Sequence, residues 1–207
     1  MSCKEKEVES AKPLLGLHVC CGPCATVAIE RLLPRFRLVC IWYNPNIYPP
    51  EEYQRRLANA IRACESFGLR LQQLSTSHRA WLEAVRGLED AVEGRERCDV
   101  CIGLRLRAAA EAAAQAGCEY LCTTLTVGPQ KNAEQIHRLG EHIAGQVGLR
   151  WLAETFRKKD GFRRSVELSR KLGLYRQDYC GCEFSLRQRR RQSNATQARF
   201  DEHCPGE

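Results

Sequence analysis

Short apolar blocks alternate with longer amphipathic segments along the chain, and this pattern predicts strands and helices in turn. Runs of aliphatic, β-branched and aromatic residues that end at turn signals predict strands over 14–20, 37–43, 69–74, 120–125 and 150–155. Apolar residues at helical spacing, an Ala-rich stretch and terminal Gly residues predict helices over 25–33, 51–67, 78–88, 102–116, 133–147 and 156–173.

This alternation favours an α/β fold in which helices cover both faces of a parallel sheet. Ligands of such sheets bind outside the carboxyl ends of the strands. Cys20, Asn44 and the pair Thr123 and Thr124 fall at these predicted ends. We therefore expect them to lie close together in space.

Length and composition fit one globular domain. The chain has 207 residues, of which 43% are hydrophobic and 28% charged, and no internal repeat or long linker divides it. We expect residues 14–192 to form a single domain, with disordered residues 1–13 before it and 193–207 after it. No apolar run approaches the roughly 18 residues needed to cross a bilayer. The charged N-terminal segment lacks the apolar core of a secretory signal, so we expect a cytoplasmic protein.

The net charge of +7 leaves two readings open. Four arginines crowd the predicted end of the domain: Arg187, Arg189, Arg190 and Arg191. Such a run contacts nucleic acid in some proteins and is a solvated tail in others.

Thirteen cysteines are the strongest chemical signal in the composition. A reducing cytoplasm disfavours structural disulfides, so clustered thiols indicate metal binding or redox chemistry. Seven lie in three tight groups: Cys20, Cys21 and Cys24; Cys98 and Cys101; Cys180 and Cys182. The other six fall in predicted core elements or tails, and we assign them no chemistry: Cys3, Cys40, Cys64, Cys118, Cys122 and Cys204.

The first two groups have the chemistry of a thiolate metal site. Neighbouring side chains such as Cys20 and Cys21 point to opposite sides of an extended segment, which makes a poor zinc chelate. At an irregular turn after a strand both could reach one iron–sulfur cube, with Cys98 and Cys101 completing the four thiolates of a [4Fe–4S] centre. Thiolate ligands fit iron–sulfur or zinc and exclude magnesium and calcium.

The third group, Cys180-Gly181-Cys182, has a different spacing. Two cysteines separated by one glycine can close a small, strained and readily reduced disulfide, so we favour a redox pair. The alternative is that both cysteines are additional metal ligands.

Two polar segments could hold an anionic partner, and each has a simpler alternative. Residues 128–132, GPQKN, follow a strand and open a helix, so they either offer N–H groups and Lys131 to a phosphate or merely cap the helix. Residues 156–162, FRKKDGF, place Lys158 and Lys159 between aromatics, as on RNA-binding surfaces or in a solvated loop. The chain has no P-loop and no dinucleotide-binding glycine loop, so ATP-dependent or NAD-dependent chemistry has no support.

Several motifs, in this order along the chain, resemble the QueH-type epoxyqueuosine reductases. They are HVCCGPC at 18–24, NPNIYPPEEYQRR at 44–56, RCDVC at 97–101 with GLRL after it, TTL at 123–125, GPQKN at 128–132, FRKKDGF at 156–162 and SRKLGLYRQDYCGC at 169–182. The resemblance covers residues 15–187, nearly the whole predicted domain.

The resemblance implies reduction of epoxyqueuosine to queuosine at the wobble position of tRNA, the last step of queuosine biosynthesis, without cobalamin. It implies a Rossmann-like fold akin to the nucleotide α-hydrolases (HUP-like), with a helical C-terminal part. By position, the [4Fe–4S] ligands are Cys20, Cys21, Cys98 and Cys101, and the redox-active disulfide is Cys180–Cys182. The implied partners are tRNA carrying epoxyqueuosine and an electron donor of unknown identity, with no membrane.

Several roles remain open beside this resemblance. Cys24, with a nearby acid such as Asp99, could hold an adjacent mononuclear iron or zinc ion. Candidate proton donors are Asp99, Lys131 and Tyr179, and candidate tRNA contacts are Lys131, Lys158 and Lys159. Ile102 and Gly128 depart from the family pattern, in which an aromatic residue and a serine are common at these positions.

Two other functions compete with epoxide reduction. A zinc-stabilised, non-catalytic RNA-binding module would contain zinc without iron or acid-labile sulfide, and its Cys180 and Cys182 would be ligands. A thiol–disulfide oxidoreductase acting on proteins would reduce insulin and be indifferent to tRNA.

Overall fold

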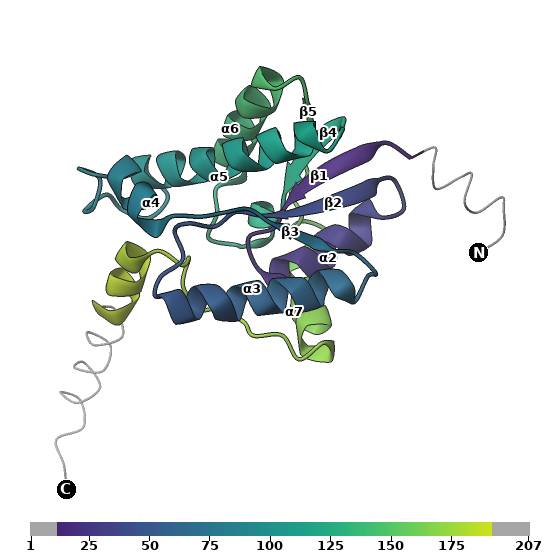
Figure 1. Cartoon of the computed structure of the whole chain (residues 1–207). Helices are drawn as coiled ribbons and strands as arrows, with labels where there is room; N and C mark the ends of the chain where they lie inside the picture. Colours follow the sequence, from purple (N-terminus) through teal and green to yellow (C-terminus); the bar gives the residue numbers. More distant parts are fainter. Residues whose placement is uncertain (1–11, 192–207) are drawn as a thin grey trace, which may run out of the picture.

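The computed structural model describes residues 12–191, and within them five strands form one parallel sheet (Figure 1). The strands are β1 (Leu14–His18), β2 (Arg37–Trp42), β3 (Leu71–Gln73), β4 (Tyr120–Thr123) and β5 (Arg150–Trp151). Their order is β3-β2-β1-β4-β5, so the chain steps outward from β1 on one side and returns to its other side for β4. The predicted α/β fold with a parallel sheet is confirmed.

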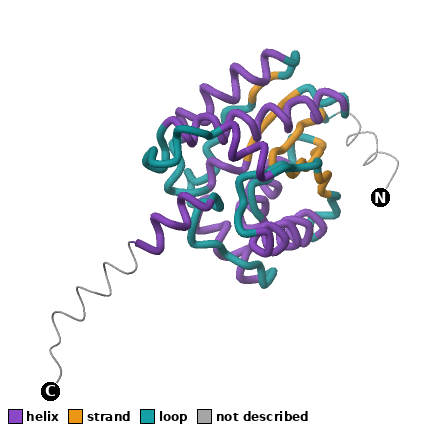
Figure 2. Tube along the Cα trace, turned by 60° about the vertical axis from the view of Figure 1, so that its left-hand side comes forward, coloured by secondary structure: helices purple, strands orange, loops and turns teal. Residues whose placement is uncertain are grey.

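Helices cover both faces of this sheet, which forms the inner layer in Figure 2. The helices are α2 (Gly22–Leu32), α3 (Pro50–Glu65), α4 (His78–Ala84), α5 (Glu96–Gln115), α6 (Ala133–Gln146) and α7 (Gly161–Lys171), and residues 183–191 are also helical. Helices α5 and α6 pack together on one face, and α2, α3 and α7 lie on the other (Figure 1).

The central strand β1 is hydrogen-bonded to β2 on one side and to β4 on the other. Its side chains Leu15 and Leu17 are fully buried in the core on the α2 side. Ile41 of β2 and Leu121 of β4 are fully buried in the core on the α5 side. Both faces of the sheet are thus apolar, which is typical of a parallel sheet covered twice.

The Cys98 and Cys101 pair lies inside a helix and not before one. The sequence predicts a helix from residue 102, but α5 begins at Glu96, so both cysteines occupy its first two turns. The residue before the helix makes no side-chain cap, so the usual sequence signal for a helix start is missing. Residues three apart on a helix share a face, so the two thiols lie on the same side of α5.

Several other predicted boundaries were also wrong. Strand β4 ends at Thr123 and a 3₁₀ helix, η1 (Thr124–Val127), follows, because the Thr123 hydroxyl accepts a hydrogen bond from the Leu125 N–H at 3.3 Å. The helix predicted from residue 25 already begins at Gly22, and the one predicted to reach residue 88 ends at Ala84.

The predicted disordered tails, 1–13 and 193–207, lie outside the described residues except for Lys12 and Pro13. The Lys12 ammonium donates to the Leu33 carbonyl at 3.0 Å, and the Pro13 carbonyl accepts from the Arg37 N–H at 3.0 Å. Within residues 12–191, each helix is too short or too polar to cross a membrane.

Gly16→Ala is expected to destabilise the domain by about 1–3 kcal/mol, because overpacking strains a well-packed core. A Cβ atom at Gly16 would lie 2.4 Å from the Cβ atom of Ala113 on α5. The control is Gly145→Ala, at an exposed helical position with no neighbouring atom within 4 Å, which should stabilise by about 0.5–1 kcal/mol. Urea unfolding measures both changes. An unchanged midpoint for G16A would contradict the close approach of β1 and α5.

Candidate active site

The candidate site lies beyond the carboxyl ends of β1, β2 and β4, where the strand order reverses. Asn44 after β2 donates from Nδ2 to the Val19 carbonyl after β1 at 2.9 Å. The Cys20 N–H after β1 donates to the Thr124 hydroxyl after β4 at 2.9 Å. The prediction that these strand ends meet is therefore confirmed.

Three cysteines gather where β1 gives way to α2. The sulfur atoms of Cys20, Cys21 and Cys24 all lie within 4.8 Å of one another. Cys21 is the N-cap of α2 and Pro23 lies in its first turn, so the chain bends enough for adjacent thiols to converge. Hydrogen bonds from Cys20 and Cys24 lower the pKa of Cys21, and the bond to Cys21 raises the pKa of Cys20 to about 11. Hydrogen bonds within the group thus favour a thiolate among the three thiols, and thiolates are ligands of soft metal ions.

Neutral hydrogen bonds hold the end of β1 in place. The Thr124 hydroxyl accepts from the Cys20 N–H and donates to the Cys20 sulfur at 3.1 Å. His18 Nδ1 lies 2.8 Å from the Thr123 hydroxyl. Burial lowers the pKa of His18 to about 3, so its ring stays uncharged. Positive charge next to the thiols therefore comes from other residues.

Cys98 and Cys101 line a small inner cavity together with Cys180 and Cys182. Cys101 is 8% exposed, and burial raises the pKa of both Cys101 and Cys98. The Gly94 N–H donates to the Cys98 sulfur at 3.1 Å, which fixes the first of the two thiols. The structure thus brings the second and third cysteine groups to one place.

Two buried arginines face the thiols with N–H groups that lack partners among the described residues. Arg105 lines both the inner cavity and the larger one beside it, and its Nε is unpaired. Its charge favours the thiolate form of both Cys20 and Cys101. Arg97 lines the inner cavity, and its Nε and Nη2 are unpaired. A guanidinium keeps its charge when buried, so an anionic hydrogen-bond acceptor in the cavity would stabilise these unpaired N–H groups.

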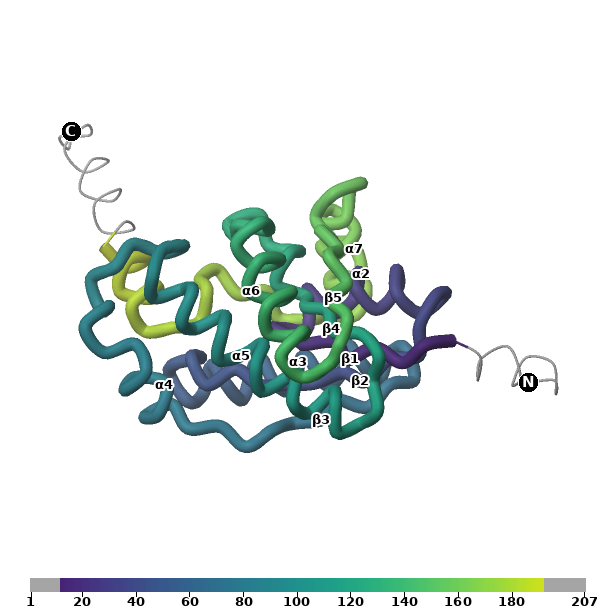
Figure 3. The backbone as a smooth tube through the Cα atoms, turned by 90° about the horizontal axis from the view of Figure 1, so that it is seen from above, coloured from purple at the N-terminus to yellow at the C-terminus, as the bar shows by residue number. Residues whose placement is uncertain are grey.

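The backbone of the Cys180-Gly181-Cys182 segment is held by α3 and the loop before it. Arg56 of α3 is 2% exposed and donates to the carbonyls of Cys180 at 3.0 Å and Tyr179 at 3.2 Å. The Tyr48 N–H donates to the Gly181 carbonyl at 2.8 Å. Gly181 has a φ of 125°, which favours glycine. Figure 3 shows this C-terminal segment beside the start of α5, where Cys182 packs near Cys101.

The two cysteines of this segment have different surroundings. Lys131 Nζ donates to the Cys180 sulfur at 3.0 Å and to Glu93 Oε1 at 2.8 Å. Burial acts to lower the pKa of Lys131, but the charges of Cys180 and Glu93 outweigh it and raise that pKa. Cys182 is 8% exposed, and burial raises its pKa to about 12. Cys180 is partly exposed, whereas Cys182 is buried.

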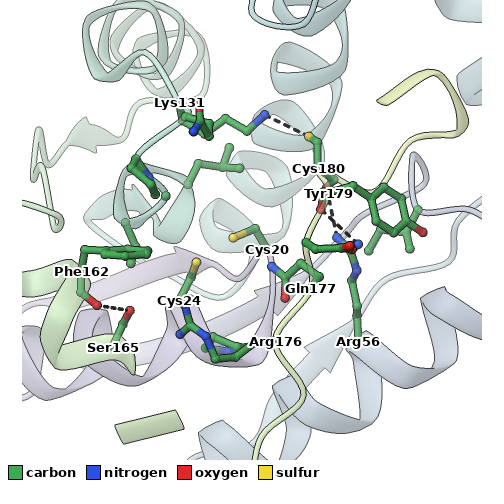
Figure 4. A pocket seen from close by; sticks show the side chains of 18 of the residues that line it. Cys20, Cys24, Arg56, Lys131, Phe162, Ser165, Arg176, Gln177, Tyr179 and Cys180 are labelled. Carbon is green, nitrogen blue, oxygen red and sulfur yellow. Dashed lines mark hydrogen bonds between the residues drawn. The ribbon is translucent and has the colours of Figure 1, made fainter. Parts of the chain in front are cut away.

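An open cavity of about 320 Å³ connects the first and third cysteine groups (Figure 4). The sulfurs of Cys20 and Cys24 point toward its middle, and Lys131 and Cys180 lie on the opposite side. Phe162 contributes an aromatic ring to its wall. This volume is within the range of small-ligand sites, so a nucleobase-sized group could enter.

The other predicted site residues lie at the rim or outside the cavity. Asp99 lines neither cavity, and its carboxylate accepts a hydrogen bond from Gln135 Nε2 at 2.8 Å. The structure therefore does not bring Asp99 to Cys24. The carbonyls of Lys158 and Lys159 accept from Arg31 at 3.0 and 2.7 Å. Both lysine side chains are exposed, on the loop before α7.

Residues 128–132 cap the start of α6. The side-chain oxygen of Asn132, Oδ1, accepts hydrogen bonds from the backbone N–H groups of Glu134 and Gln135 at the start of α6. Lys131 is paired with Glu93 and Cys180 and is not a free cation at the helix start.

Sequence reasoning missed three residues that build the site: Arg56, Glu93 and Arg105. Arg105 had a usable signal, because it follows Cys101 by four positions on a helix and so shares its face. Arg56 and Glu93 had none, since their partners lie 124 and 38 residues away in the chain.

Thr124→Val is expected to raise the rate of iron loss from metal-loaded protein about tenfold, in the range typical of residues that orient a ligand. Valine has the shape of threonine but removes both hydrogen bonds to Cys20. The rate of iron transfer to a coloured chelator is the measurement. Thr124→Ser retains the hydroxyl and should behave like the wild type. Equal rates for T124V and wild type would show that Cys20 needs no such support.

Comparison with known proteins assigns the chain to a family. The family model described as Epoxyqueuosine reductase QueH matches residues 15–188. An Epoxyqueuosine reductase QueH of Thermotoga maritima is 37% identical over 177 residues, which cover 84% of this chain and 91% of that protein. An Epoxyqueuosine reductase QueH of Streptococcus pyogenes serotype M1 is 35% identical over 187 residues, which cover 87% and 73%.

A solved structure supports the fold. The U34-tRNA thiolase NcsA of Methanococcus maripaludis, described with its [4Fe-4S] cluster, aligns with a TM-score of 0.54 and 14% identity. The alignment covers 97% of this chain and 70% of NcsA. At this identity the likeness concerns the fold alone, and it supports the expected Rossmann-like α/β fold.

Proposed function

Because this chain belongs to the QueH family of epoxyqueuosine reductases, which are oxidoreductases of queuosine biosynthesis, we propose that it reduces epoxyqueuosine at the wobble position of tRNA without cobalamin. The observation that carries this proposal is the shared cavity. It has thiols of the first cysteine group, Cys20 and Cys24, on one side and Cys180 on the other. A substrate there meets both a metal-binding group and the Cys180 sulfur of the dithiol.

The metal group we propose is a [4Fe–4S] cluster held by Cys20, Cys21, Cys98 and Cys101. The donor set fits, because it consists of soft thiols only. The unpaired N–H groups of Arg97 and Arg105 also fit, because they offer hydrogen bonds and positive charge to an anionic cluster. When bound, such a cluster supplies electrons one at a time.

Cys24 is the remaining thiol of the first group, and we assign it to an adjacent mononuclear iron or zinc ion. Its sulfur lies within 4.8 Å of those of Cys20 and Cys21, so the ion would be next to the cluster. Because Asp99 bonds to Gln135, the structure does not place it as a second ligand of this ion.

The electron count of the reaction matches the dithiol. Opening the epoxide to an alkene breaks both carbon–oxygen bonds, consumes two electrons and two protons and releases water. Closing Cys180 and Cys182 to a disulfide releases two electrons and two protons. Of the three candidate proton donors, Lys131 and Tyr179 line the cavity, and Asp99 does not. The Tyr179 hydroxyl donates to the Tyr48 carbonyl, so we propose that protons reach the leaving oxygen from Lys131.

The tRNA would approach over the mouth of the cavity with its modified base turned outward from the anticodon loop. Phe162 is 38% exposed, and the Arg176 guanidinium lies 5.8 Å from its ring centre, so the pair offers a stacking surface to a base. Lys158 and Lys159 lie on the exposed loop just before this phenylalanine and would contact phosphates.

The test is incubation of anaerobically prepared protein with tRNA that carries epoxyqueuosine and a reductant, followed by nucleoside mass analysis. We expect conversion of epoxyqueuosine to queuosine with a mass loss of one oxygen. The control is the same tRNA without protein. Unchanged epoxyqueuosine with iron-loaded protein and an active reductant would contradict the proposal.

A further inference from the structure

We propose that an external dithiol regenerates the Cys180–Cys182 pair, that it reacts at Cys180 and not at Cys182, and that Lys131 holds Cys180 ready for this exchange. The inference rests on the redox role given to the pair in the proposed function. It adds the chemical class of the electron donor, the sulfur that the donor meets and a residue that controls the step.

The access of the two sulfurs is unequal. Cys180 is partly exposed and lines both the open cavity and the inner one. Cys182 lines only the inner cavity and packs in a cluster with Trp81, Phe184 and Cys101. The Ser185 N–H also donates to its sulfur at 3.4 Å. A thiol arriving through the open cavity therefore meets Cys180 first.

Lys131 is built into the protein as the charge partner of Cys180. Its ammonium donates to the Cys180 sulfur at 3.0 Å and is kept in place by Glu93 at 2.8 Å. Its backbone carbonyl accepts a hydrogen bond from Arg157, and Asn132 next to it caps α6. A cation at this distance stabilises negative charge on sulfur. Cys182 packs among largely apolar neighbours, and burial raises its pKa more than the charge of Arg97 lowers it.

The exchange balances in two steps. The donor's first thiolate attacks the Cys180 sulfur, the bond between the two cysteine sulfurs breaks, and Cys182 leaves and takes a proton. The donor's second thiol then loses its proton. The resulting thiolate attacks the donor's first sulfur, which is bonded to Cys180 in the mixed disulfide. Cys180 leaves as a thiolate beside the Lys131 ammonium. The donor is oxidised to a disulfide, and the pair gains two electrons and one proton, which Cys182 carries, while Cys180 keeps its negative charge beside Lys131.

The test compares mixed-disulfide formation at each sulfur alone. Iron-loaded C182S and C180S proteins are mixed with glutathione disulfide under anaerobic conditions, and peptide mass spectrometry follows modification at each cysteine. We expect Cys180 to react at least about tenfold faster than Cys182, because attack depends on access and on thiolate character. In the C182S background, Lys131→Gln should slow Cys180 about tenfold, which is the effect of about 1.4 kcal/mol. Lys131→Arg should restore most of the rate.

The control is Lys171→Gln in the same background, because Lys171 is exposed at the end of α7. It removes the same charge and should leave the rate unchanged. Equal rates at the two sulfurs, or no effect of K131Q, would overturn the inference. So would protection of both sulfurs in iron-loaded protein, which would identify them as metal ligands.

Epoxide turnover by the same variants separates this inference from the proposed function. If turnover needs both cysteines but their exchange rates are equal, only the inference fails. If C180S and C182S both reduce epoxyqueuosine at the wild-type rate, the redox role itself is wrong and the inference falls with it.

Discussion

Cys101→Ala is expected to remove most of the iron from the protein and to reduce epoxide turnover to background. Cys101 is 8% exposed and shares one face of α5 with Cys98, so its removal takes away one of the two thiols that this helix offers. A cubic cluster takes four protein thiolates, and metal binding depends steeply on a complete set. Iron and acid-labile sulfide per chain are the measurement, with about four of each in the wild type and below about one in C101A.

The matched control for this substitution is Cys118→Ala. Cys118 is 7% exposed and packs in the core between α5 and β4, away from the cavities. The C118A protein should lose some stability and retain its iron. This result would separate the loss of a ligand from general damage to the core. Four irons per chain in C101A would show that Cys101 is not a ligand. Zinc without iron or sulfide in the wild type would instead support the zinc-stabilised RNA-binding module.

The fold could be predicted because its signals are local. Leu15 and Leu17 lie in an apolar run ended by Gly22 and Pro23, and such runs separated by helical patterns specify a parallel sheet. The ends of strands and helices were predicted wrongly where a side chain competes with the backbone for hydrogen bonds, as Thr123 does at the end of β4. The start of α5 was predicted wrongly because no side-chain cap marks it in the sequence.

The site could be predicted only as far as its residues carry chemistry in the sequence. The three cysteine groups stand out by spacing, and the resemblance assigned them roles. The contacts between groups depend on how distant segments pack, so sequence could not supply them. Lys131 illustrates this: its position after a strand suggested a phosphate contact, whereas packing of the C-terminal segment pairs it with Cys180, 49 residues away.

Cys182→Ala is expected to lower epoxide turnover with a dithiol reductant by about 1,000-fold or more, a loss of roughly 4 kcal/mol in transition-state stabilisation. A single remaining thiol cannot close a disulfide within the pair. It therefore cannot deliver the two electrons that reduction of the epoxide requires. The measurement is the rate of queuosine formation in tRNA by nucleoside mass analysis. Cys180→Ala should lose a similar factor, because residues that act as one unit lose most of the activity when either is removed.

Iron content decides what such a loss means. If Cys180 and Cys182 form a redox pair and are not ligands, both variants should retain about four irons per chain while turnover collapses. Cys101→Ala should lose both iron and turnover. Loss of iron in the C182A protein would instead make Cys182 a ligand, which its place with Cys98 and Cys101 in the inner cavity would then explain. Wild-type turnover in either variant would leave the two electrons to come entirely from the metal centre, because the dithiol would be dispensable.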